Sequence, residues 1–93
     1  MASIRDLKKD IDCLVGEVIS DCYLAIYFHP EKKQDIVTVM EEAVALRNAL
    51  FVQVNHPAEK NNPSLVRKHF AHIRQEMFAK VDSLFQKLSG LAK

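Results

Sequence analysis

Apolar residues recur three and four residues apart along most of the chain, in three blocks separated by His-Pro and Asn-Pro dipeptides. This spacing is typical of one face of an α-helix. The first block carries Ile4, Leu7, Ile11, Leu14, Val18, Cys22 and Ala25, flanked by Val15, Ile19 and Ile26. Ser3, with Asp6 three residues later, matches a variant of the capping box and predicts the start of a helix. His29-Pro30 predicts its end near Phe28, because the residue before a proline is disfavoured in the α region.

The second block starts at Pro30, which suits the first turn of a helix because its missing N–H has no intrahelical partner there. Its apolar face comprises Ile36, Met40, Ala43, Leu50 and Val54. It ends before His56-Pro57, and the polar stretch 56–62 predicts a loop. Asn62-Pro63 then predicts the start of a third helix, for which Gly90 suits the C-terminal cap. The third block carries Val66, Phe70, Ile73, Met77, Val81, Leu84, Leu88 and Leu91.

Block length and connection length together predict the architecture. Each block has about 25 residues, which corresponds to about 37 Å of α-helix. Short connections favour antiparallel neighbours. The sequence therefore predicts an all-α fold, an up-down-up three-helix bundle of long antiparallel helices, with residues 1–93 forming a single domain.

Composition and charge exclude several functional classes. The 93 residues are 48% apolar and 27% charged, which is typical of an ordered globular domain. Thirteen basic and twelve acidic side chains are interspersed, and a net charge of +1 without a basic stripe argues against DNA binding. No apolar run has the length of a membrane span, and charges from Arg5 onward leave no signal-peptide core. We therefore expect a cytoplasmic protein without a membrane segment.

Cys13 and Cys22 lie nine residues apart in the first predicted helix. That separation is about 13 Å along the helix axis. It exceeds the roughly 7 Å that a disulfide allows between two Cα atoms. We expect two free thiols, as small core or interface residues in a reducing compartment.

Candidate metal-binding residues are few. His69, His72 and Glu76 share one side of the third helix, at a spacing that can bind a divalent metal. Because that side lies opposite the apolar stripe, a solvated polar face is favoured and no metal site is predicted. His29 and His56 each close a helix, where a protonated imidazole stabilises the C-terminal end.

Catalytic motifs are missing from the sequence. Glycine occurs only at positions 16 and 90, which leaves no glycine-rich loop to bind phosphate. No serine or cysteine has a recognisable base beside it. We expect neither an enzyme nor a cofactor.

Arg47 occupies a position in the second block where the spacing asks for an aliphatic residue. Its stem can pack between helices while the guanidinium reaches water, it can form an ion pair that fixes helix register, or it can bind an anion. In an antiparallel hairpin Arg47 comes level with about Leu14, which makes Asp10 and Glu17 the nearest carboxylates. If such a pair is buried, removing the carboxylate alone should cost about 3 kcal/mol or more.

A second stripe on the first predicted helix points away from its core face. It comprises Cys13, Gly16, Ser20, Tyr23 and Tyr27. The second helix has a similar back face of small residues, Thr38, Ala45, Ala49 and Val52. A helix that is apolar nearly all round is usually covered all round, so we predict a subunit interface here. An ordinary exposed surface and a ligand groove are the alternatives. In a two-fold antiparallel crossing, the tyrosines of one copy can fill the shallow groove of the other.

Four segments between residues 4 and 63 carry a further indication: IRDLKKDIDCLVGEVISD, YFHPEKK, EEAVALRNAL and VNHPAEKNNP. With them, the chain resembles an uncharacterised family of short helical proteins from Bacteroidetes. The resemblance implies an all-α fold and a cytosolic bacterial protein. It implies no activity and assigns no functional residue.

The leading hypothesis is a non-enzymatic protein–protein interaction module that self-associates through its first and second helices, with an unidentified protein partner as a variant. The alternative is a small-ligand or metal-binding protein that uses Arg47 or the side with His69, His72 and Glu76. A weaker alternative is an RNA- or ribosome-associated factor that uses the lysines near the loops.

Overall fold

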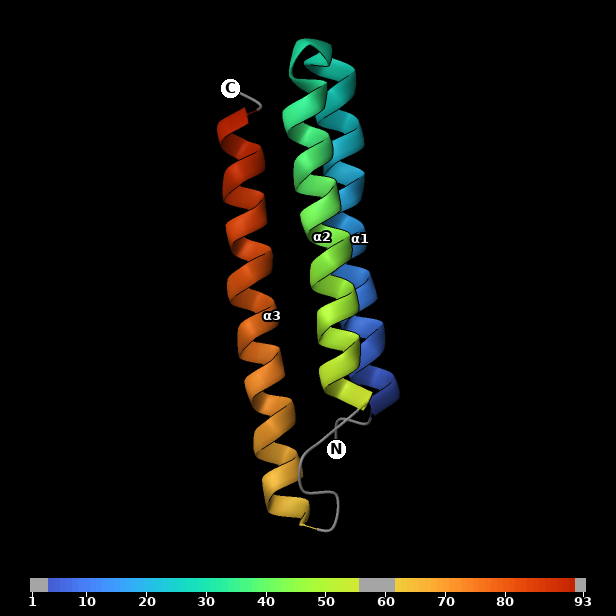
Figure 1. Cartoon of the computed structure of the whole chain (residues 1–93), viewed down its shortest axis with the longest axis vertical. Coiled ribbons are helices and arrows are strands. Elements are labelled where there is room, and N and C mark those ends of the chain that lie inside the picture. Colours follow the sequence, from blue (N-terminus) through green and yellow to red (C-terminus); the bar gives the residue numbers. More distant parts are fainter. Residues whose placement is uncertain (1–3, 56–61, 92–93) are drawn as a thin grey trace.

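Three long helices make up the computed structural model, which describes residues 4–55 and 62–91 (Figure 1). They are α1 (Ile4–Phe28), α2 (Lys33–Asn55) and α3 (Pro63–Leu91), with a short 3-10 turn, η1 (Pro30–Lys32), between α1 and α2. In Figure 1 the chain runs up α1, down α2 and up α3, within a rod of 51 × 19 × 17 Å. The predicted all-α, up-down-up three-helix bundle is confirmed.

The corner between α1 and α2 is built around His29 and Pro30. His29 leaves the helical conformation, with φ −134° and ψ 64°, although its N–H still donates to the carbonyl of Ala25. The predicted end of the first helix at Phe28 is therefore confirmed. The α-helix that follows begins at Lys33, three residues later than predicted, because the first turn after Pro30 closes as a 3-10 turn.

Asn62 caps the start of α3 as predicted. Its Oδ1 accepts hydrogen bonds from the backbone N–H groups of Ser64 and Leu65, at 3.1 and 3.2 Å. The prediction for Gly90 is wrong, because α3 continues to Leu91 and Gly90 has no positive φ. The predicted cap at Ser3, His56 and most of the predicted loop 56–62 lie outside the described residues.

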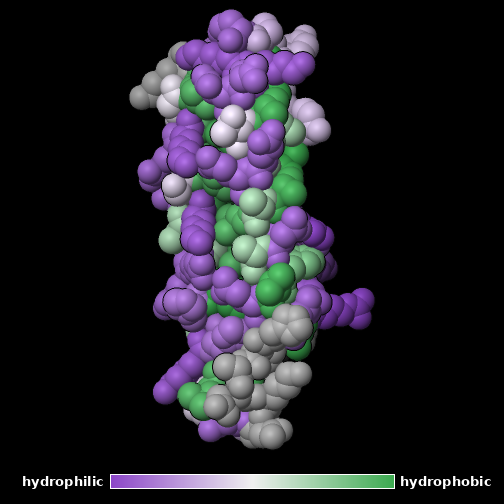
Figure 2. Space-filling view, in the orientation of Figure 1, coloured by the Kyte–Doolittle hydropathy of each residue, from purple (hydrophilic) through white to green (hydrophobic). Residues whose placement is uncertain are grey.

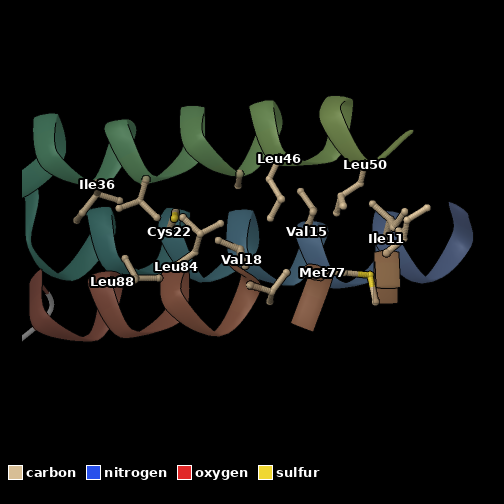
Figure 3. Close-up of a cluster of buried hydrophobic side chains, with 14 of the residues drawn as sticks. Ile11, Val15, Val18, Cys22, Ile36, Leu46, Leu50, Met77, Leu84 and Leu88 are labelled. Carbon is tan, nitrogen blue, oxygen red and sulfur yellow. The ribbon is translucent and has the colours of Figure 1, made fainter. Parts of the chain in front are cut away.

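A single hydrophobic core runs along the length of the bundle. Its side chains from the three helices meet along the bundle axis (Figure 3). No charged or polar residue is buried among those that the structure describes. The buried residues are Leu7, Ile11, Val15, Val18, Cys22 and Ala25 of α1, Ile36, Val39, Ala43, Leu46, Leu50 and Val54 of α2, and Ile73, Met77, Val81, Leu84 and Leu88 of α3.

The helices are rotated slightly from the predicted orientation. Val15 is buried where Leu14 was expected, and Ile4 is exposed. In α2, Val39 and Leu46 take the core positions predicted for Met40 and Arg47. Spacings of three and four residues fit both assignments, and the choice between adjacent residues depends on where the other two helices lie.

Within the described residues, each pair of helices is bridged by an ion pair near the surface. Arg47 reaches Asp12 between α2 and α1, at 2.6 Å. The α1–α3 pair is Arg74–Asp10, and the α2–α3 pair is Lys87–Glu42. Half-exposed pairs of this kind contribute at most about 1 kcal/mol each to stability. Their placement at all three helix pairs favours one relative rotation of the helices.

Candidate interaction surface

The outer face of α1 carries the residues predicted to form an interface. Cys13, Gly16, Ser20, Tyr23 and Tyr27 are all exposed, opposite the buried side of the helix. A Cβ atom added at Gly16 would meet no atom within 4 Å, so the middle of this face is open. The exposure needed for the predicted interface is therefore present, and the interface itself stays a prediction.

The last two turns of α1 form an exposed apolar cluster, here called the α1 terminal patch: Tyr23, Leu24, Tyr27 and Phe28. These side chains are 64%, 57%, 77% and 65% exposed. The rings of Tyr27 and Phe28 meet edge to face, with centroids 5.3 Å apart. The spacing of the outer stripe predicts the two tyrosines as surface residues but not Leu24 and Phe28. The uncharged run 22–28 was the only available indication of them.

Apolar grooves border the patch on both sides. Tyr23 lies at the edge of a groove between α1 and α2, whose apolar lining includes Ile26, Val37, Met40 and Val44. On the opposite side, a groove between α1 and α3 is lined by Leu24, Ala25, Phe28, Phe85 and Leu88. The apolar surface therefore continues from the crest of α1 into both neighbouring grooves.

The face formed by α2 and α3 has a different character. Figure 2 shows polar side chains over much of this face, with apolar side chains visible between them. Its groove contains the small residues Ala45 and Ala49, and Glu42, Lys80 and Lys87 line it as well. Thr38 and Val52, also predicted on the back of the second helix, are exposed. Charged side chains also line the grooves beside the patch, Lys33 and Glu41 on one side and Asp21 on the other. The α2–α3 groove has three charged side chains and no aromatic one, so it is a poorer apolar docking surface than the outer face of α1.

Arg47 has a carboxylate partner on α1, although not one of the two predicted. Its Nε donates to Oδ1 of Asp12 at 2.6 Å, and its guanidinium carbon lies 4.2 Å from the centroid of the Phe51 ring. Asp10 instead accepts from Arg74 of α3, and Glu17 is exposed. Asp10 and Asp12 lie about 160° apart around the helix, so they face different neighbours. The prediction of Asp10 and Glu17 as partners of Arg47 is therefore wrong.

The two cysteines are free and occupy opposite environments. Cys13 is exposed, and Cys22 is fully buried in the core. Burial, together with the nearby Asp21 carboxylate, raises the pKa of the Cys22 thiol. Cys22 therefore stays neutral and unreactive near neutral pH.

The histidine-containing side of α3 does not assemble a metal site. The Nε2 of His69 lies 2.7 Å from the backbone carbonyl of Gln53, which can only accept, so the ring donates. His69 is therefore half-buried against α2 instead of lying on the predicted solvent side. His72 lies 3.9 Å from Glu76, and Glu76 accepts from Lys80 at 2.8 Å. Among the described residues, no three potential ligands come together around a metal position.

Electrostatics around Glu76 are set by its neighbours on the same helix. The hydrogen bond from Lys80 lowers the pKa of Glu76, and the charges of Lys80 and His72 act in the same direction. Partial burial opposes the shift without reversing it.

His29, at the corner between α1 and α2, lies near a carboxylate. Its Nδ1 is 3.5 Å from Oε1 of Glu31, within range of a surface ion pair when the imidazole is protonated.

Comparisons with known proteins identify no function for this surface. No protein-family model, no curated protein and no solved structure matches the chain. Within the described residues, none of the helices combines the length and hydropathy needed to span a bilayer.

Proposed function

We propose that this chain is a non-enzymatic, cytoplasmic protein–protein interaction module that self-associates through the outer face of α1. The observation that carries the proposal is the α1 terminal patch, where four large apolar side chains are each more than half exposed. Contiguous exposed apolar surface is unfavourable in water and marks interaction sites. Tyrosine is enriched at interface cores because its ring is buried while its hydroxyl reaches polar groups.

Self-association is supported by the charge of the chain and by the small residues on the same face. A net charge of +1 produces little repulsion between two copies. Gly16 and Ser20 allow a second backbone to approach α1 closely, beside the ridge formed by the tyrosines. In an isologous dimer both copies use the same patch, so the ridge of one copy can lie against the open space at Gly16 of the other. Val44 of α2, exposed beside the groove at Tyr23, extends the same surface onto the second helix.

Binding of a small apolar ligand is the second candidate. It is favoured by the groove between α1 and α2, whose walls are mostly apolar. Such a ligand would occupy the groove in a monomer. Whether the chain is a dimer or a monomer in solution therefore distinguishes the two functions.

Sedimentation equilibrium of the wild type and of the double variant Gly16→Arg with Tyr23→Lys tests the proposal. We expect a wild-type dimer at micromolar concentration and a monomeric double variant with unchanged helical circular dichroism. Arginine at Gly16 fills the open centre of the face, and lysine at Tyr23 places a positive charge within the patch. Leu65→Glu, on an exposed part of α3 away from this face, is the control and should remain dimeric.

A wild type that stays monomeric at high micromolar concentration contradicts self-association. In that case, saturable binding of an apolar fluorescent probe to the wild type would favour the ligand-binding function, provided that Met40→Glu in the α1–α2 groove abolishes this binding. RNA that co-purifies and dissociates at high salt would instead favour the RNA-associated alternative.

A further inference from the structure

The outer face of α1 has two chemically different halves. Arg5, Lys9, Gly16, Tyr23 and Tyr27 are all exposed. At 100° per residue they fall within about 40° of one another around the helix axis, so they form one line. The N-terminal half of this line carries two cations, and the C-terminal half carries two aromatic rings.

Gly16 lies at the midpoint of this line and of the helix. Ile4 and Phe28, the ends of α1, are each twelve residues from it. Arg5 and Tyr27 are each eleven residues from Gly16, and Lys9 and Tyr23 are each seven. In an antiparallel pair related by a two-fold axis, residues at equal distances on opposite sides of the axis face each other. An axis through Gly16 therefore brings each cation of one copy opposite a tyrosine of the other.

We infer that the partner of α1 is the α1 helix of a second copy, antiparallel and centred on Gly16, with Arg5 and Lys9 facing the partner's Tyr27 and the partner's Tyr23. The inference rests on the proposed self-association and specifies its geometry. Cations attract the faces of aromatic rings, so the two halves of the line are complementary. The symmetric dimer contains each of these contacts twice.

The cations on this face are available for such contacts. Neither Arg5 nor Lys9 has a hydrogen bond or ion pair to another described residue, whereas Asp10 and Asp12 of the same helix are paired within the bundle. Gly16 supplies the close approach, because the space where its side chain would lie is open. The charges that hold the bundle together are therefore distinct from those that face outward.

Other arrangements of two α1 helices lose this complementarity. In a parallel pair each residue faces the same residue of the other copy. Arg5 then meets the partner's Arg5 and Lys9 meets the partner's Lys9, and these like charges repel. An antiparallel pair centred on Ser20 moves Arg5 and Lys9 away from the tyrosines and past the end of the partner α1 helix. Only the register through Gly16 brings both cations onto rings.

Disulfide cross-linking tests the register in the full-length chain. Exposed Cys13 is replaced in a Cys13→Ser background, and buried Cys22 is kept. Gly16→Cys in this background should form a covalent dimer under mild oxidation, because the two-fold axis brings its two Cα atoms to within disulfide range, about 4.4–6.8 Å. Ser20→Cys is the matched control. Its two copies lie at least about 12 Å apart along the axis, so they should remain uncross-linked.

The cation–ring contacts have their own test. Lys9→Gln should raise the dimer Kd on the order of tenfold, because two symmetry-related contacts are lost. Lys68→Gln on α3 removes the same charge from another exposed position and should leave the Kd unchanged. An unchanged Kd for Lys9→Gln contradicts the inferred register.

Failures of the register and of self-association give different results. If the wild type sediments as a dimer and Ser20→Cys cross-links in place of Gly16→Cys, or neither cross-links, the register is overturned and self-association stands. If the wild type is monomeric and Gly16→Cys forms no covalent dimer, self-association itself is overturned. Circular dichroism of each variant verifies that the bundle is folded in both cases.

Discussion

Arg47 of α2 donates from Nε to Oδ1 of Asp12 on α1 across 2.6 Å, and this ion pair is substantially exposed. The side chains of Arg47 and Asp12 are 39% and 52% exposed, respectively. Water therefore solvates both groups when either partner is removed, and no buried charge is left behind. The guanidinium also covers the ring of Phe51, so Arg47 does more than pair with a carboxylate.

Replacing Asp12 should thus have a small effect. We expect Asp12→Asn to lower the free energy of unfolding by less than about 1 kcal/mol in urea titrations. Arg47→Met should cost a similar amount, because the contact with Phe51 is lost along with the ion pair. The approximately 3 kcal/mol expected for a buried pair does not apply to this geometry. A loss of that size for Asp12→Asn would contradict the exposed pair.

The end of α1 and the start of α3 could be predicted from the sequence because their causes are local, whereas the cap predicted at Gly90 was wrong. Pro30 restricts the residue before it, and Asn62 caps the backbone that directly follows it. Neither effect requires knowledge of the rest of the fold. The corner after His29 differed from prediction only in the 3-10 geometry of its first turn.

Helix rotation and pairing could not be derived in the same way. Leu46 and Arg47 are adjacent, and only the positions of α1 and α3 determine which of them enters the core. The exchange of Asp10 for Asp12 as the partner of Arg47 has the same origin. The exposure of Leu24 and Phe28 is likewise tertiary, because an apolar residue at a helix end is compatible with either core or surface.

Gly16 should be a weak point of the α1 helix in the monomer. Glycine within a helix costs roughly 0.5–1 kcal/mol relative to alanine. Because a Cβ atom at position 16 meets no neighbour, Gly16→Ala should stabilise the dissociated chain by about that amount. Thermal unfolding at concentrations below the dimer Kd measures this effect. Gly90→Ala, in the final turn of α3, is the control, and its effect should be smaller because helix ends fray.

The same Gly16→Ala variant should associate more weakly than the wild type. A methyl group at the centre of the helix crossing holds the two backbones apart, so sedimentation should show a higher Kd even as the monomer becomes more stable. A variant that gains monomer stability and keeps the wild-type Kd would place the contact elsewhere on the molecule.

The two thiols should differ in reactivity in the folded protein. Cys13 is exposed in the single chain and lies on the proposed contact face, so a thiol reagent should modify one group rapidly at neutral pH when the folded chain is kept below the dimer Kd. Burial and the raised pKa of Cys22 keep the second thiol neutral and inaccessible until the bundle opens. Under non-reducing denaturing conditions both thiols should titrate. An intramolecular Cys13–Cys22 disulfide, detected as a loss of both thiols in the unfolded chain, would contradict the continuous α1 helix.

The free energy of unfolding should depend on pH through the ionisation of the Cys22 thiol. Because its pKa in the folded chain is raised, the stabilisation is fully present below the pKa of the unfolded thiol and is lost as the pH rises through the folded value. Stability should therefore decline in the alkaline range. Cys22→Ala should remove this part of the decline, even though the lost sulfur packing lowers stability at every pH.

Glu76 should contribute to the acid sensitivity of the bundle. The pKa of its carboxyl is lowered in the folded chain, first by the hydrogen bond from Lys80. A lowered pKa means that the stabilisation is fully present above the pKa of the unfolded glutamate and is lost as the pH falls through the folded value. We therefore expect the contribution, under about 1 kcal/mol for an i,i+4 pair, to be complete above about pH 5 and to vanish in stronger acid.

Urea titrations of the wild type and Glu76→Gln between pH 7 and pH 3 test this assignment. The variant should be slightly less stable than the wild type at neutral pH, and the difference should close as the pH falls, because the protonated wild-type side chain and the amide are then nearly equivalent. Glu41→Gln removes a carboxylate from an exposed position on α2 and controls for the change in net charge. A difference that is constant with pH, or that widens in acid, would show that Glu76 acts through packing instead of through its charge.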